Sequence, residues 1–240
     1  MLRGVCRLAT AAVLCSAAGL AMAGSFSLAP LGLSIAPRES SSSVVAINSG
    51  DGPLVIQVKT LAWTQRDGKD VRDETRDLIA NPPIFKLGPG EQQLVRFASR
   101  SGPPRDVEAS YRAVFSEVLP KDAPQGASGF RITLAMDIPV YVEPVAPASS
   151  VPIRWQAERT ASGIRLNADN PGNVHYRVVD AQFSAEGAVL RMHGILAVLP
   201  KSRITIDLPA PPRSATAIQL SAQDSASQTV SVDIPLPPAT

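Results

Sequence analysis

Cysteine is almost absent from this chain of 240 residues, because Cys6 and Cys15 are its only two. Both lie in a segment where basic residues precede an apolar run at 8–20, which ends in Ala21-Met22-Ala23. This order is typical of a secretory signal peptide, so we expect residues 1–23 to be removed near Ala23. The exported chain would then form no disulfide, and the packing of its core alone would stabilise it.

An excess of charge of either sign is also lacking. Arg3 and Arg7 are two of the 23 basic residues, so the chain after the signal peptide has 21 basic residues against 21 acidic ones. This balance argues against nucleic acid or an anionic membrane surface as a partner. No later apolar run reaches about eighteen residues, which argues against a transmembrane helix. We therefore expect a soluble product outside the cytoplasm, with no membrane insertion.

Helical periodicity is missing as well, and this points to an all-β chain. Apolar residues after the signal peptide recur in short alternating runs, and 22 prolines punctuate them. Turn signals every 8–12 residues are the signature of a β-sandwich. Asp67-Gly68 is typical of a hairpin turn, and Val189-Leu190 is one of the short candidate strands of the second half. The segment 145–152, rich in Pro, Ser and Ala, reads as a linker. We therefore predict two β domains, at 24–144 and 153–240.

The residues that enzymes and metal sites require are scarce. The chain has two histidines, His175 and His193, and no thiol after the signal peptide. No cluster of Asp, Glu and His has the spacing of a metal site, and no Gly-x-Ser-x-Gly motif is present. We therefore expect no enzymatic activity, no metal and no cofactor.

One stretch stands out among the predicted strands. From residue 130 to 143 its even positions are all apolar and its odd positions are mostly polar, so one face of the strand would be wholly apolar. Pro139 lacks an N–H group, which favours an edge strand or a strand end. The stretch is either a half-buried strand of an ordinary sandwich or an edge whose apolar row is partly kept for another protein.

Two arginines lie inside predicted strands, at Arg96 and Arg112. An arginine in a strand is commonly a solvated residue of the exposed face. The alternative is a pair that binds a carboxylate, a task that the two-pronged guanidinium performs well.

The order and spacing of these motifs resemble the periplasmic pilus-assembly chaperones of the chaperone–usher pathway. The resemblance covers nearly the whole exported chain and rests on 81–97, 111–120, the alternating strand 130–143, 170–175 and 198–200. It implies two immunoglobulin-like β-sandwich domains in an angled, boomerang-like arrangement. It also implies a periplasmic chaperone that folds pilus subunits by donor-strand complementation and delivers them to an outer-membrane usher. By this resemblance the donated row is Phe130, Ile132, Leu134 and Met136, while Ile138, Val140 and Val142 belong to the chaperone's own core.

The chain departs from that family at one functional pair. The basic residues that anchor the subunit's terminal carboxylate correspond here to about Gly32 and Pro139. The amino-acid sequences of the motifs more closely resemble those of the divergent, archaic branch, found with spore-coat-type pili. Because an unpaired carboxylate in the cleft would be costly, we expect another anchor, with Arg112 and Arg96 as candidates and Arg38 as the fallback.

Two other functions compete with the chaperone. A secreted pilus subunit or adhesin is a single incomplete domain, often with a disulfide, whereas this chain contains two sets of strands. A carbohydrate-binding module would stack sugars on exposed aromatic rings, for which Trp63, Trp155, Tyr111 and Tyr141 are available. An exposed aliphatic row at 130–136 would favour the chaperone. Self-association of the free chaperone would be another way to cover such an edge.

Overall fold

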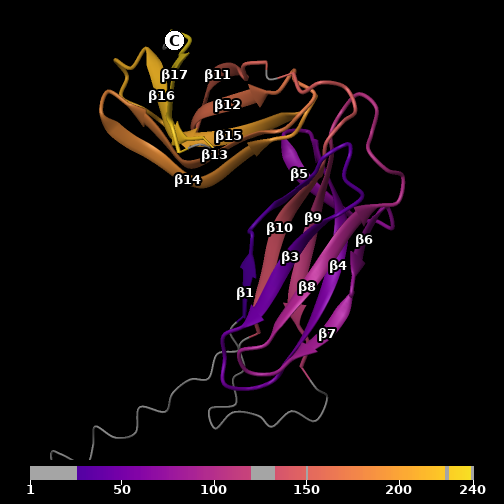
Figure 1. The fold of residues 1–240 in the computed structure, drawn as a ribbon. Coiled ribbons are helices and arrows are strands. Elements are labelled where there is room, and N and C mark those ends of the chain that lie inside the picture. The colour runs from indigo at the N-terminus through magenta and orange to yellow at the C-terminus, as the bar shows by residue number, and fades with distance from the viewer. Residues whose placement is uncertain (1–25, 120–132, 150, 225–226, 239–240) are drawn as a thin grey trace, which may run out of the picture.

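The computed structural model describes residues 26–119, 133–149, 151–224 and 227–238, and every regular element in them is a strand. The chain folds into two β-sandwiches that meet at an angle (Figure 1). The N-terminal sandwich contains β1 (Phe26–Ala29), β2 (Leu33–Ile35), β3 (Ser42–Asn48), β4 (Leu54–Arg66), β5 (Lys69–Glu74), β6 (Leu78–Asn81), β7 (Ile84–Leu87), β8 (Gln92–Ser99), β9 (Ala109–Glu117) and β10 (Ala135–Val142). The C-terminal sandwich contains β11 (Arg154–Thr160), β12 (Gly163–Asp169), β13 (Tyr176–Ala185), β14 (Ala188–Val198), β15 (Arg203–Pro209), β16 (Ala217–Gln223) and β17 (Thr229–Pro235).

In the N-terminal sandwich, one sheet has the strand order β1-β3-β8-β6 and the other the order β2-β10-β9-β4-β5, with β7 also on β4. The first strand region changes sheets at Pro30, so that β1 pairs with β3 while β2 pairs with β10. Alternate residues of both sheets fill the core between them, where Phe97 and Phe115 pack edge to face at 6.1 Å. Burial of Ile138, Val140 and Val142 in this core confirms their predicted place.

In the C-terminal sandwich, the sheets have the orders β11-β12-β15 and β14-β13-β16-β17. Strands β14 and β15 are therefore edge strands of different sheets. The core is aliphatic around Phe183, which has a T-shaped contact with Trp155 at 6.2 Å. The chain crosses from one sandwich to the other between Val142 and Arg154.

Two strands were not predicted at their full length. Strand β5 is polar, with the burial pattern of an exposed ribbon, and it forms a hairpin with β4. The turn at Asp67-Gly68 was predicted, and its φ angles of 52° and 76° suit a tight hairpin turn. Strand β14 runs over eleven residues, although only Val189-Leu190 looked like a strand. Its alternation is weak because much of this edge strand is exposed.

Candidate functional site

Within the described part of the chain, one edge of β10 is unpaired over five of its eight residues. On one side β10 pairs with β9 along all eight of its residues, and a further bond from the N–H of Glu117 to the carbonyl of Leu134 (3.0 Å) extends this pairing. On the other side it pairs with β2 only at Val140–Val142. In the part of the chain that the structure describes, no strand pairs with that side of residues 135–139. This edge is therefore available for backbone pairing with another chain.

The predicted donor row begins before β10. Leu134 and Met136 are half-buried and pack against the N-terminal core. Ala135 faces the opposite side of the strand and is exposed. Phe130 and Ile132 lie outside the described residues. The assignment of all four as a donor row remains a prediction.

Arg112 lies on the outer face of the sheet, beside β10. Its Nε donates to Asp137 Oδ1 at 2.7 Å and its Nη2 to the backbone carbonyl of the same residue at 3.1 Å. The guanidinium also lies over the ring of Trp63, 4.9 Å from its centroid, in a cation–π arrangement. The other Asp137 oxygen accepts from Arg72 Nη1 at 2.6 Å. Two cations thus converge on one carboxylate, and sequence reasoning missed Arg72 because it lies in the polar strand β5.

The other anchor candidates lie elsewhere. Arg96 is exposed on β8, in the opposite sheet, so the structure does not bring it together with Arg112. Arg38 lies in the loop between β2 and β3 and has no ion pair among the described residues. Gly32 and Pro139 are neighbours, because a Cβ on Gly32 would lie 3.3 Å from Pro139 Cγ. The two positions that usually hold the basic pair are therefore adjacent here, as the resemblance implies, without basic side chains.

The tip of the β4–β5 hairpin joins the two sandwiches. Gln65 Nε2 donates to the carbonyl of Ala197 (3.0 Å) and to Asp70 Oδ1 (2.9 Å), and its Oε1 accepts from the N–H of Leu199 (2.9 Å). The carbonyl of Gly68 accepts from the N–H of Thr205 at 2.9 Å. The tip of this hairpin, which belongs to the N-terminal sandwich, is thus hydrogen-bonded to β15 and to the end of β14.

A second contact between the sandwiches is formed by an acid and an imidazole. The Glu108 carboxylate, only 2% exposed, lies 2.8 and 3.0 Å from His175 Nδ1. The His175 ring stacks on Tyr141 with 3.6 Å between centroids. Burial, together with the nearby Glu108 charge, raises the pKa of the Tyr141 hydroxyl. Tyr141, Trp63 and Leu199 form a small apolar cluster between the sandwiches.

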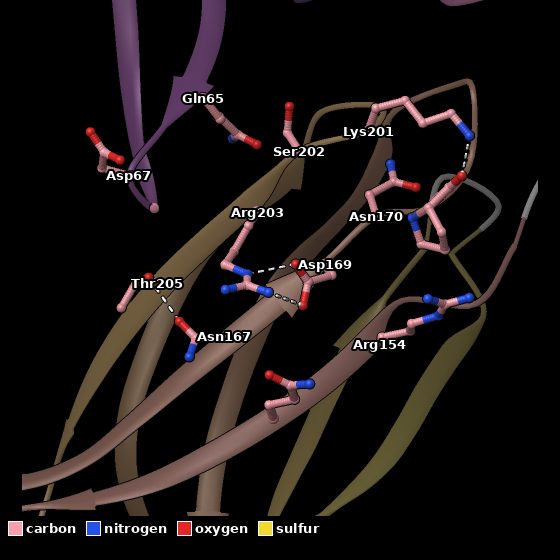
Figure 2. A pocket seen from close by; sticks show the side chains of 13 residues that line it. Gln65, Asp67, Arg154, Asn167, Asp169, Asn170, Lys201, Ser202, Arg203 and Thr205 are labelled. Atoms are coloured by element: carbon pink, nitrogen blue, oxygen red, sulfur yellow. Dashed lines mark hydrogen bonds and ion pairs between the residues drawn. The ribbon is translucent and has the colours of Figure 1, made fainter.

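Two cavities flank the hairpin. One, of about 800 Å³, is polar and is shown in Figure 2, where Gln65 and Asp67 of the hairpin lie across the cavity from Asn167 of β12 and Arg203 of β15. Arg203 in this cavity pairs with Asp169 at 2.6 Å, and Lys201 donates to a backbone carbonyl. The other, of about 450 Å³, lies between the sandwiches on the side of Arg112 and Trp63.

The four aromatic candidates for sugar stacking, Trp63, Trp155, Tyr111 and Tyr141, do not form an exposed cluster of rings. Trp63, Tyr111 and Tyr141 are buried, and Trp155 packs against the C-terminal core. Among the described residues, no group of three or more His, Cys, Asp or Glu is arranged to bind a metal ion. The same residues include no helix long and apolar enough to cross a membrane.

Comparison with known proteins shows which proteins this chain resembles in sequence and in fold. Residues 25–148 match the family described as pili and flagellar-assembly chaperone, PapD N-terminal domain. The uncharacterized fimbrial chaperone YhcA of Escherichia coli (strain K12) is 23% identical over 141 residues, which are 59% of this chain and 59% of that protein.

Solved structures share the fold over most of the chain. A chain of the CsuC–CsuE chaperone–tip adhesion subunit pre-assembly complex, from the archaic chaperone–usher Csu pili of Acinetobacter baumannii, is 19% identical with a TM-score of 0.68; the match covers 89% of this chain and all of that one. The E. coli chaperone DraB is 18% identical with a TM-score of 0.61, over 89% of this chain and all of DraB. These likenesses establish the two-domain immunoglobulin-like fold. With the match over residues 25–148, they show that the chain belongs to the family of pili and flagellar-assembly chaperones.

Proposed function

We propose that this chain is a periplasmic chaperone that holds pilus subunits by donor-strand complementation and delivers them to an outer-membrane usher. The donated row is Phe130, Ile132, Leu134 and Met136. The bound subunit is an incomplete sandwich whose open groove receives these side chains. Residues 1–23 direct the chain to the periplasm and are removed there.

The open edge of β10 is the observation that carries this proposal. Proteins normally cover or charge an edge strand, because unpaired backbone groups attract other chains. Among the described residues no strand pairs with this edge of 135–139, and the apolar Leu134 and Met136 beside it are only half-buried. Strand addition uses both features, since main-chain hydrogen bonds provide affinity and alternate side chains fill pockets.

Burial of the donated row supplies part of the energy of such a complex. Full burial of an aliphatic or aromatic side chain contributes about 1.5–3 kcal/mol. Part of the surface of Leu134 and Met136 is already buried against the N-terminal core, so their burial by a subunit contributes less than this. Association costs about 4–15 kcal/mol, so main-chain hydrogen bonds along the edge of β10 must add to the contribution of these side chains.

Arg112 is the proposed anchor for the subunit's terminal carboxylate. It is 15% exposed and lies beside Pro139, one of the two positions where the family's basic pair is missing. Arg72 adds a second cation at the same place. Arg96, in the other sheet, would have to act separately.

The donor strand can be tested with a matched pair of variants. Ile132→Asp and Leu134→Asp place a charge in the donated row, and we expect both to abolish capture of co-expressed pilus subunits. Ala135→Asp, on the exposed opposite face of the same strand, should retain capture. Co-purification of chaperone and subunit from the periplasm measures the effect, and melting curves check the fold. Subunit levels equal to wild type in Ile132→Asp would contradict the donor assignment.

The competing functions find less support. A carbohydrate-binding module needs exposed rings, whereas the aromatic candidates are buried or packed against a core. A pilus subunit would lack a strand, whereas the family match extends over a chaperone domain.

A further inference from the structure

The cavity of about 450 Å³ between the sandwiches has an apolar wall and a charged rim. The N-terminal sandwich contributes Trp63, Arg72 and Arg112. The C-terminal sandwich contributes a group of aliphatic side chains together with polar ones at the rim. The aliphatic members are Ile195, Leu196, Ala197, Ile204 and Ile206.

The aliphatic wall exists because the C-terminal sandwich is open on this side. Strands β14 and β15 are edges of different sheets, so no backbone pairing closes the gap between them. Core residues such as Leu196 and Ile206, which are 1% and 7% exposed, therefore line the cavity from behind. One hydrogen bond crosses the gap near the rim, from Arg191 Nη1 to the carbonyl of Asp207 (2.6 Å).

Ile195 is the exposed member of this wall. Its side chain is 56% exposed on β14, although it lines the cavity. Met192 is three residues away on the same strand and is 71% exposed, but it does not line the cavity. Ile195 is thus accessible to a molecule that enters the cavity from solvent.

The rim has the charge to receive an anion. A guanidinium has five N–H donors, and Arg112 uses its Nε–H and one Nη2–H on Asp137. Its remaining N–H groups have no partner among the described residues. Arg72 contacts the same Asp137 carboxylate, so this group of two arginines and one aspartate carries one net positive charge. Asp70, Asp207 and Arg191 also line the cavity, and Arg191 donates to the backbone of Asp207.

We propose that this cavity is a side-chain socket in which the C-terminal domain selects an apolar residue next to the carboxylate of the bound subunit. The carboxylate would lie toward Arg112 and Arg72, and its neighbouring apolar side chain would contact Ile195, Leu196 and Ile206. The inference rests on the proposed function, because it places the end of the subunit in the cleft. The inference goes beyond that function in two ways. The side chain next to the carboxylate is apolar, and the C-terminal domain takes part in recognising it.

The socket can be probed with short peptides and the full chain. Trp155→Phe leaves Trp63 as the single tryptophan, and Trp63 lines the cavity, so its fluorescence reports occupancy. Acetylated tetrapeptides ending in leucine carboxylate, leucine amide or aspartate are titrated in turn. We expect the leucine carboxylate peptide to bind at least tenfold more tightly than either of the others, which is about 1.4 kcal/mol.

Two variants on one strand test the wall. Ile195→Asp should weaken binding of the leucine carboxylate peptide at least tenfold. Met192→Asp should change the dissociation constant of this peptide less than twofold. Both residues are more than half exposed, so both variants should melt like the parent; Ile195→Thr serves as a milder substitute if the aspartate lowers the melting temperature. A parent protein that binds leucine and aspartate peptides alike, or binds neither, overturns the socket, as does an equal effect of the two variants.

The result is separable from the donor strand. If the socket fails while Ile132→Asp still abolishes subunit capture, the proposed function stands without the socket. If Ile132→Asp and Leu134→Asp retain capture, the donor assignment fails whatever the peptides do.

Discussion

Replacement of Gln65 by alanine should uncouple the two sandwiches without unfolding either of them. This side chain is 9% exposed and forms three hydrogen bonds, of which two reach the C-terminal sandwich at Ala197 and Leu199. Each bond contributes about 0.5–1.5 kcal/mol net, and a buried N–H left without an acceptor costs about 1–3 kcal/mol. If the sandwiches stay together, the N–H of Leu199 has lost its acceptor, so we expect a loss of about 2–4 kcal/mol.

That loss is large for this interface. The apolar cluster between the sandwiches has only three buried residues, Trp63, Tyr141 and Leu199. If the sandwiches separate, the newly exposed polar groups form hydrogen bonds with water. Separation therefore costs less free energy than leaving these groups buried without a partner. Gln65→Ala should therefore show a larger radius of gyration in small-angle X-ray scattering and two calorimetric transitions where the wild type shows one.

A matched control lies next to it in the chain. Thr64 is exposed on the opposite face of β4, and Thr64→Ala should leave both measurements unchanged. A single transition at the wild-type temperature in Gln65→Ala, with an unchanged radius of gyration, would refute the reasoning that this amide couples the sandwiches.

Two further predictions concern charged groups of the N-terminal sandwich. Arg112→Ala should weaken subunit capture while the sandwich melts within a few degrees of wild type, because Arg72 still pairs with Asp137. Lys59 is exposed on the same sheet, so Lys59→Ala is the control. Unchanged capture in Arg112→Ala would remove Arg112 as the anchor. Hydrogen bonds from Ser101 and Tyr111 lower the pKa of Asp77 below its ordinary value of 3.8, so its stabilising effect is complete above that value and is lost as the pH falls through the lower folded pKa. Asp77→Asn should therefore be less stable than wild type at pH 6 and approach it at about pH 2, as urea unfolding will measure; a constant difference across this range would contradict the assignment.

The sequence predicted the fold because its signals were local. Alternation of apolar residues indicated one wholly apolar face over 130–143, and Asp67-Gly68 indicated a hairpin. Pro139 indicated an edge, and the pairing of β10 with β2 is indeed limited to Val140–Val142. Each of these depends on residues that are neighbours in the chain.

The site was harder to predict because its members are distant in the chain. Arg72 and Asp137 are 65 residues apart, and the strand order β10-β9-β4-β5 of the folded sheet brings them together. The Gln65 contacts span more than 130 residues. Strand β14 was missed over most of its length because an edge strand exposed on both faces loses the alternation that reveals a strand.

The hairpin that bridges the sandwiches has a consequence for how this chain can be divided. By position in the sequence, Gln65 and Gly68 belong to the N-terminal sandwich, but their bonding partners are in the C-terminal one. The border between the domains in space therefore differs from the border at the linker. A chimera that joins this N-terminal half to the C-terminal half of a relative would need the hairpin tip, residues 65–70, to come from the same parent as the C-terminal half.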